Sequence, residues 1–295
     1  MHTHKINRGL FLAIIFIFGS IGINAATFTA AASGDWATPA TWTLNSGTDP
    51  DGVPDADDTV TVPSGRVVTV SSAQSVQSLA INTGGTLTLN AGSTLTMAGG
   101  GSYSGLGIVN GTGTFRTQGA TTFGGSTNFT APLEVNSGTT LGSGNIGGSL
   151  TVLSGAILNT TNQNFTVDGD LANSGTVTKS SGTFRVNGAN IVNNGTISGA
   201  AFTFGGTGTQ SLSGTGSFTA SITALSGSVT TLTSDVTFGN GNVTATDLIL
   251  NTGSTRVRAS IKDRESHVPR SFLWSKWRPQ SNCQGRLESR LPIRT

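Results

Sequence analysis

Five aspartates crowd one short stretch of the chain, and calcium binding is the chemistry that such a stretch suggests first. Asp49, Asp51, Asp55, Asp57 and Asp58 lie close together in TDPDGVPDADD. Calcium takes about six to eight oxygen ligands, and Asp-rich turns supply them. The stretch lacks the fully spaced Asp loop with its late Glu, and Asp and Pro are also ordinary turn residues. A calcium site and a plain turn both stay open, and no other cofactor is predicted.

Two tryptophans just before this stretch are the candidate ligand-binding side chains. Trp36 and Trp42 both precede the aspartates in the sequence. An exposed indole ring can stack on a sugar ring. Tryptophans at the start of a repeat protein more often pack over its first repeat, because an open end exposes apolar side chains. Packing is therefore the favoured interpretation, with glycan stacking as the alternative.

Catalytic side chains are scarce in the long central part of the chain. Between residues 59 and 246 the acids are Glu134, Asp168, Asp170 and Asp235, and residues 26–255 contain no His or Cys. Glycoside hydrolysis needs paired carboxylates, and a Ser nucleophile needs an imidazole partner. Asp168 and Asp170 flank a glycine in VDGDL, which is typical of a turn. The sequence therefore predicts no catalytic residue and no enzyme.

These side chains must be positioned by short strands that alternate with glycine turns. One short motif recurs along the chain. It consists of an apolar residue, then Asn or Leu, a small residue, Gly, a small residue and a further apolar residue. The copies are INTGGTL (81–87), LNAGSTL (89–95), VNSGTTL (135–141), VLSGAIL (152–158), ANSGTV (172–177), VNNGTI (192–197) and LNTGSTRV (250–257). Gly and Asn tolerate positive φ, and the flanking Val, Ile, Leu and Thr favour strands.

The even spacing of the turns predicts how the strands stack. Gly155, Gly175 and Gly195 recur at equal intervals. The apolar residues two positions later are Ile157, Val177 and Ile197. We expect these three side chains to face one interior stack, since each follows its turn in the same register.

A phenylalanine series supports the same period. Phe165, Phe184 and Phe202 recur at nearly the same interval as the turn glycines. A repeat of about 20 residues with at least two strands is typical of a solenoid. We therefore predict an all-β, single-stranded parallel β-helix (β-solenoid) over residues 71–255, with a β-sandwich as the alternative. About ten coils would form a rod of roughly 50 Å.

Threonine pairs with one residue between them are frequent, for example Thr86/Thr88 and Thr176/Thr178. A flat ladder of such pairs is how some β-solenoids bind ice. Threonine also suits any exposed strand face, and here it is not confined to one register. We therefore interpret the pairs as exposed strand positions.

Residues 26–70 differ from the repeats and are predicted to form an amino-terminal cap with the first strands. They hold two of the four tryptophans and four of the eight prolines. A cap is needed because an open solenoid end exposes apolar side chains and unpaired strand edges.

The sequence of this segment is GDWATPATW…DGVPDADDTVTVPSGRVVTV. It resembles the amino-terminal segment of secreted bacterial β-helix repeat proteins of the adhesin and autotransporter-passenger type. It also resembles the related eight-glycine extracellular domain. The matching residues are Trp36, Pro39, Ala40, Thr41, Trp42, Val53, Pro54, Asp57, Asp58, Thr59, Val60, Pro63, Gly65 and Val68. The close match is confined to this segment, and the remainder is similar only in style. The resemblance implies an extracellular, right-handed parallel β-helix and implies no reaction.

Residues 1–25 have the features of a secretory signal peptide. Lys5 and Arg8 precede an apolar run over residues 10–23, and cleavage is expected before Ala26. The run is shorter than the ~20 residues needed to span a bilayer. An uncleaved anchor is the alternative. No later segment is apolar enough to span, so we expect a secreted or cell-surface protein.

The net charge of +2 conceals three regions of different charge. Residues 1–25 carry +2, residues 26–255 carry −7 (four bases, eleven acids) and residues 256–295 carry +7 (ten bases, three acids). The acidic body argues against nucleic-acid binding. The composition changes abruptly after Thr255. The tail is therefore predicted to be disordered or out of frame, with a functional basic tail for acidic polysaccharide or anionic lipid as the alternative.

Together these features predict an extracellular structural or adhesive surface repeat protein. Its long lateral face would bind surface glycans or host and matrix surfaces weakly and multivalently. The alternative is a carbohydrate-binding or carbohydrate-active β-helix.

Overall fold

The computed structural model describes residues 24–123, 127–142, 144–161 and 164–224, and then the short strands at 228–232, 237–238, 243–244 and 248–250. The predicted signal peptide, apart from its last two residues, and the predicted basic tail lie outside the described residues.

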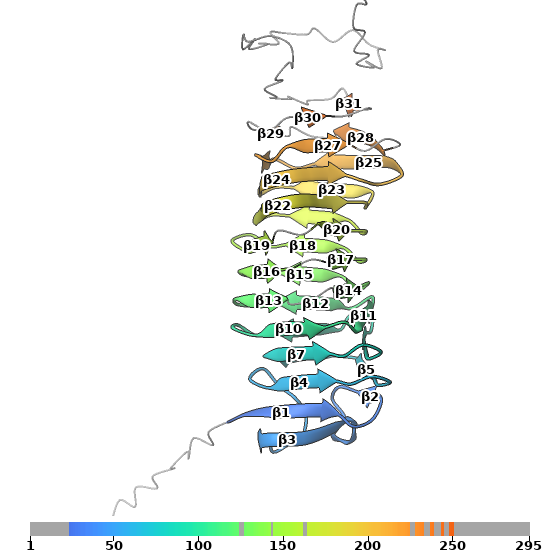
Figure 1. Ribbon diagram of the computed structural model, residues 1–295, viewed down its shortest axis with the longest axis vertical. Helices are drawn as coiled ribbons and strands as arrows, with labels where there is room; N and C mark the ends of the chain where they lie inside the picture. The colour runs from blue at the N-terminus through green and yellow to red at the C-terminus, as the bar shows by residue number, and fades with distance from the viewer. Residues whose placement is uncertain are drawn as a thin grey trace, which may run out of the picture.

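The described chain is all-β and winds through three walls of parallel strands, which stack along the long axis of the molecule (Figure 1). The first wall contains β1 (Asn24–Ala30), β4 (Thr59–Val62), β7 (Ser78–Ile81), β10 (Ser102–Gly105), β13 (Thr121–Phe123), β16 (Thr139–Leu141), β19 (Ile157–Thr160), the first halves of β22 (Thr176–Val186) and β24 (Thr196–Phe204), β26 (Ser217–Phe218) and β29 (Thr237–Phe238).

The other two walls are built in the same way. The second wall contains β2 (Gly34–Asp35), β5 (Val67–Val70), β8 (Thr86–Leu89), β11 (Ile108–Gly111), β14 (Thr127–Phe129), β17 (Gly144–Ile146), β20 (Phe165–Val167), the second halves of β22 and β24, β27 (Ile222–Ala224) and β30 (Val243–Thr244). The third wall contains β6 (Ala73–Val76), β9 (Thr94–Met97), β12 (Thr114–Thr117), β15 (Leu133–Val135), β18 (Leu150–Val152), β21 (Leu171–Asn173), β23 (Asn190–Asn193), β25 (Gly208–Ser213), β28 (Ser228–Leu232) and β31 (Leu248–Leu250).

One circuit of the three walls, here called a coil, is the repeating unit. Eight successive coils between Thr59 and Ser213 each contribute one strand to every wall, and β26–β31 continue the walls beyond them. Paired residues in adjacent coils are between 17 (Phe129 and Ile146) and 24 (Leu79 and Tyr103) positions apart. The predicted β-solenoid and the predicted length of its coils are therefore confirmed.

The core lies inside the three walls. In β8 and β9 every second side chain is buried, as the period of two in a strand requires. The phenylalanine series is confirmed as an interior stack. Phe165 pairs with Phe184 and Phe184 pairs with Phe202, and their ring centroids are 5.5 and 5.4 Å apart. Each fully buried side chain of this kind contributes about 1.5–3 kcal/mol to folding.

Near the third coil, aromatic rings from all three walls meet in the core. Tyr103 of the first wall, Phe115 of the third and Phe129 of the second have centroid distances of 5.1–6.1 Å. The Tyr103 hydroxyl is buried without a hydrogen-bond partner, and burial raises the pKa of Tyr103 to about 12. This level of the core is thus closely filled and contains a phenol that favours its neutral form.

The prediction that Ile157 faces the interior is wrong. Its side chain is 45% exposed, whereas Val177 and Ile197 are buried as predicted. The residue that pairs with Val177 is Leu158. The loop from Val152 to Leu158 is longer than the equivalent loop from Asn173 to Val177, so aligning the glycines misplaces the strand by one position. A slip of one residue moves a side chain to the opposite face of a strand.

Candidate functional site

The cap consists of β1, β2, the short 3-10 helix η1 (Pro39–Thr41) and β3 (Trp42–Thr48), followed by the aspartate loop. β1 pairs antiparallel with β3 and parallel with β4 of the first coil, and the three strands lie together at the blue end of the rod in Figure 1. The loop over residues 49–58 connects β3 to β4 and therefore passes over the junction between cap and coils.

Local hydrogen bonds of the aspartates fold this loop. Asp49 Oδ1 accepts from the backbone N–H groups of Asp51 (3.1 Å) and Gly52 (3.2 Å). Asp51 Oδ1 accepts from Val53 N–H at 2.9 Å. Aspartate side chains that bond to the backbone two residues on are typical of turns. The turn interpretation therefore accounts for the positions of Asp49 and Asp51.

Asp58 has a different role, because it joins the loop to β1. Its side chain is buried, Oδ1 accepts from Ala26 N–H at 2.6 Å, and Oδ2 accepts from Asp55 N–H at 2.8 Å. Its backbone carbonyl accepts from Gln77 N–H at 3.0 Å and from Ser78 N–H at 3.1 Å. Charge-assisted bonds of this kind are about twice as strong as neutral ones. Asp58 thus connects the cap to the second coil.

Three of the five predicted aspartates converge. Asp49, Asp55 and Asp58 each place a carboxylate oxygen within 4.8 Å of the other two, while Asp51 and Asp57 lie outside this group. Burial, and then the side-chain hydrogen bond with Asp51, raise the pKa of Asp49. The side-chain hydrogen bond with Asp57, and then burial, raise the pKa of Asp55. The group could supply part of a calcium ligand set, and a cation there would relieve the crowding of negative charge.

The two tryptophans lie inside the cap. Trp36 is 0% and Trp42 is 7% exposed, and their rings meet edge to face with centroids 5.0 Å apart. Trp36 Nε1 donates to Pro54 O at 3.1 Å, and Trp42 Nε1 donates to Trp36 O at 2.7 Å. Glycan stacking needs an exposed ring face, which Trp36 would offer only if the cap opened.

The two carboxylates of VDGDL bind amides of separate coils. Asp168 accepts from Asn145 Nδ2 and from Asn187 Nδ2, both at 2.6 Å. Asp170 accepts from the backbone and side-chain nitrogens of Asn190, both at 2.9 Å. The sequence interpretation recognised the turn but missed these asparagine contacts, whose only signal is a spacing close to one repeat length.

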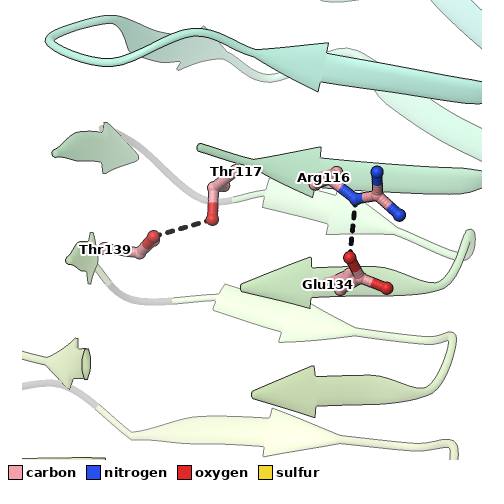
Figure 2. Close-up of polar contacts among 4 residues, drawn as sticks. All are labelled: Arg116, Thr117, Glu134 and Thr139. Carbon is pink, nitrogen blue, oxygen red and sulfur yellow. Dashed lines mark hydrogen bonds and ion pairs between the residues drawn. The ribbon is translucent and has the colours of Figure 1, made fainter. Parts of the chain in front are cut away.

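Figure 2 shows an outward and an inward polar contact between coils. Arg116 Nε donates to Glu134 Oε1 at 2.6 Å on the outside of the third wall. The hydroxyls of Thr117 and Thr139 are 2.8 Å apart in the buried interior, where one must donate to the other. The Arg116–Glu134 pair is partly exposed to solvent and contributes about 0–1 kcal/mol. The buried pair satisfies two hydroxyls that would otherwise be costly to bury.

The outer face of the first wall carries an unbroken line of polar, uncharged side chains, here called the hydroxyl column. Its members are Thr27, Thr59, Ser78, Ser102, Thr122, Thr140, Asn159, Thr178 and Ser198. Each member is in register with the next, with one member in the cap strand β1 and one in each coil. Ser78 and Ser102 are not a backbone pair of β7 and β10, but Ser102 N–H donates to Ser78 Oγ at 3.2 Å. The threonine pairs as a whole are not confined to this wall, because Thr86 and Thr88 lie in β8 of the second wall and Thr94 and Thr96 lie in β9 of the third.

These features define the class of the protein, a β-solenoid repeat protein with an amino-terminal cap. Within the described part of the chain, no helix is long and apolar enough to cross a membrane. No protein-family model, curated protein or solved structure matches the chain.

Proposed function

We propose that the protein is an extracellular structural or adhesive repeat protein that binds surface glycans or matrix through its lateral faces. The observation that supports this most is the hydroxyl column, which presents one hydrogen-bonding side chain per coil. Adjacent members are about 4.8 Å apart along the rod. Export rests on the predicted signal peptide, and the adhesive role rests on the resemblance of residues 26–70 to secreted β-helix proteins.

The chemistry of the column suits a hydroxyl-rich ligand. Its side chains are hydroxyls and one amide, which both donate and accept hydrogen bonds. A single exposed hydrogen bond contributes little, but many contacts on one rigid rod act at a high effective concentration. Because the column carries no charge, binding to it should depend only weakly on salt.

A matched pair of triple variants tests the column. We expect Thr122→Val, Thr140→Val and Thr178→Val together to weaken retention of the full chain on a glycan array by at least about tenfold. The control combines Thr88→Val, Thr96→Val and Thr151→Val, which lie on the outer faces of the other two walls. The control should bind like the parent. Equal loss in both triples, or no retention of the parent on any glycan, would contradict the proposal.

Export is tested separately. Amino-terminal sequencing of protein recovered from the culture medium should begin at Ala26. Protein that stays inside the cell with its first residues intact would contradict export without bearing on the column.

The second candidate is a carbohydrate-binding or carbohydrate-active β-helix. The observation that favours it is a hollow of about 310 Å³ on the second wall, lined by Phe165 and by five polar residues that include Arg185.

A further inference from the structure

The hollow opens over β20 and the second halves of β22 and β24. Its lining residues are Asn164, Phe165, Thr166, Thr183, Arg185 and Thr203. The lining therefore offers one guanidinium, three hydroxyls and one amide, and no carboxylate. Ligand pockets usually measure about 300–1,000 Å³, so this hollow has room for one or two sugar rings.

Two hydrogen bonds fix the guanidinium. Arg185 Nε donates to Asn187 Oδ1 at 2.7 Å, and Nη2 donates to Gly205 O at 2.6 Å in the next coil. A Cβ at Gly205 would lie only 2.0 Å from Arg185 Nε. Gly205 does not have a positive φ. Glycine is therefore needed at position 205 to leave space for the Arg185 side chain. The backbone conformation at this position does not itself require glycine.

A line of side chains over three coils supports this placement. Asn187 Nδ2 donates to Asp168 Oδ1 at 2.6 Å, and Asp168 Oδ2 accepts from Asn145 Nδ2 at 2.6 Å. Asp168 belongs to this line and not to the lining of the hollow. The orientation of Arg185 is thus set during folding, which reduces the entropy lost when a ligand binds.

We propose that this hollow is a subsite for the carboxylate of an acidic saccharide, with Arg185 as the anion-binding group. An arginine has more N–H donors than its two intramolecular bonds use, and its planar donor set matches a carboxylate. The threonine hydroxyls and the Asn164 amide of the lining would bind the neighbouring sugar hydroxyls. The proposal rests on the proposed extracellular role only for the choice of ligand, and the hollow lies on a different wall from the hydroxyl column.

Titration calorimetry of the full chain with short oligouronates tests this site. We expect oligouronates to bind, and the same oligosaccharides with their carboxyls reduced to alcohols to bind at least about tenfold more weakly. Arg185→Gln should cause a similar loss. Gly205→Ala should also weaken binding while keeping the charge, because its methyl displaces the guanidinium.

Arg116→Gln is the matched control, since it removes the same charge from the third wall, where Arg116 is paired with Glu134. It should leave oligouronate affinity unchanged. Equal binding of the carboxylated and reduced forms would overturn the proposal. So would equal losses in Arg116→Gln and Arg185→Gln, or no binding by the parent. Thermal melts establish that each variant is folded.

An independent observation concerns the start of the processed chain. Ala26 N–H donates to Asp58 Oδ1 at 2.6 Å, and both residues are 1% exposed. Ala26 is also the residue before which cleavage is predicted. Hydrolysis of the Ala25–Ala26 peptide bond by a signal peptidase consumes one water. It leaves a carboxylate on Ala25 and an α-ammonium group on Ala26.

The geometry points to an ion pair between this ammonium group and Asp58 in the processed chain, which would fasten the cap only after export. Asp49 and Asp55 lie within 4.8 Å of Asp58, so the new positive charge would enter a group of three carboxylates. A buried ion pair is favourable only where its members keep further hydrogen bonds. Asp58 meets this condition through its bond from Asp55 N–H. This inference rests on the proposed export for the position of the cleavage.

The test compares the chain that begins at Ala26 with one extended by Gly-Ser before Ala26. The processed chain should melt higher than the extended chain at pH 7, because only the processed chain places a positive charge beside the buried Asp58 carboxylate. Asp58→Asn should remove the difference, and Asp170→Asn should not. Equal melts of the processed and extended chains would overturn the ion pair, and secreted protein that begins elsewhere would overturn its premise.

Discussion

In the cap each stabilising contact occurs once, whereas in the coils the same contact recurs one coil later. Trp36 and Trp42 each give one indole N–H to one carbonyl, and Asp58 uses both carboxylate oxygens on two backbone N–H groups. In the coils, by contrast, Phe165 and Phe184 fill equivalent places on successive strands. The cap is thus a set of specific contacts, and the coils are a set of equivalent ones.

This difference matters because the two regions respond differently to damage. Between the first coil and β31, each described coil pairs with a coil on both sides, as expected of a repeat protein. Among the described residues, the cap adjoins coils on one side, where β1 pairs with β4 and covers a strand edge that would otherwise be open. The effect of a substitution in the coils on stability should therefore depend on whether its side chain lies in the interior. The effect of a substitution in the cap should depend on whether the first coil stays covered.

The largest effect is expected for a charge placed inside the coils. Val177→Asp buries an unpaired carboxylate at a 0% exposed position and should cost several kcal/mol. Ile157→Asp is the matched control. Its side chain is 45% exposed, so the change should stay within about 0.5 kcal/mol. Chemical denaturation measures both values. Similar losses in the two variants would mean that the register of β19 against β22 is wrong.

A comparison of Trp36→Ala with Phe184→Ala addresses the cap and the coils directly. Each removes a buried aromatic ring and should cost about 3–5 kcal/mol. Hydrogen exchange should separate them, because Trp36→Ala should expose the amides of β1, β3 and β4, while Phe184→Ala should expose those of β20, β22 and β24. Loss of protection along the whole rod in both variants would show that cap and coils unfold as one unit.

A smaller effect at neutral pH, but a distinct one at alkaline pH, is expected for Tyr103→Phe. The hydroxyl has no partner, so its removal should be neutral or slightly stabilising at pH 7. The pKa of Tyr103 is raised from 10.0 to about 12. Parent stability should therefore fall as pH rises from 10 through 12, by about 2–3 kcal/mol, and the variant should lack this loss. Parallel alkaline melts of parent and variant would contradict the buried phenol.

The smallest effect is expected at the aspartate loop. If calcium binds, EDTA should lower the melting temperature, and Asp49→Asn with Asp55→Asn should remove that effect, while Asp170→Asn should not. The pKa values of Asp49 and Asp55 are raised from 3.8. Without a cation, their contribution to stability is complete below pH 3.8 and is lost as pH rises through the folded-state values. The double variant should then melt slightly higher than the parent at pH 7. Identical parent melts with and without EDTA would leave only the turn interpretation.

The sequence by itself determined the class of fold. A glycine turn, an alternating strand and the return of the pattern at a regular interval are local properties that can be recognised without knowing which strands pair. The phenylalanine series succeeded for the same reason, because Phe165, Phe184 and Phe202 each start a similar local pattern. The unusual composition of residues 26–70 likewise indicated a cap.

Only the tertiary structure decided which residues meet across coils. Members of the hydroxyl column are unevenly spaced along the chain between β7 and β24, so no fixed period reveals that they share one line. Arg185 and Gly205 come together because β22 and β24 pair, and three of five aspartates converge within the loop between β3 and β4. Ile157 shows the physical reason. The side of a strand that faces the core depends on where the preceding loop ends, and pairing with the neighbouring coil fixes that point.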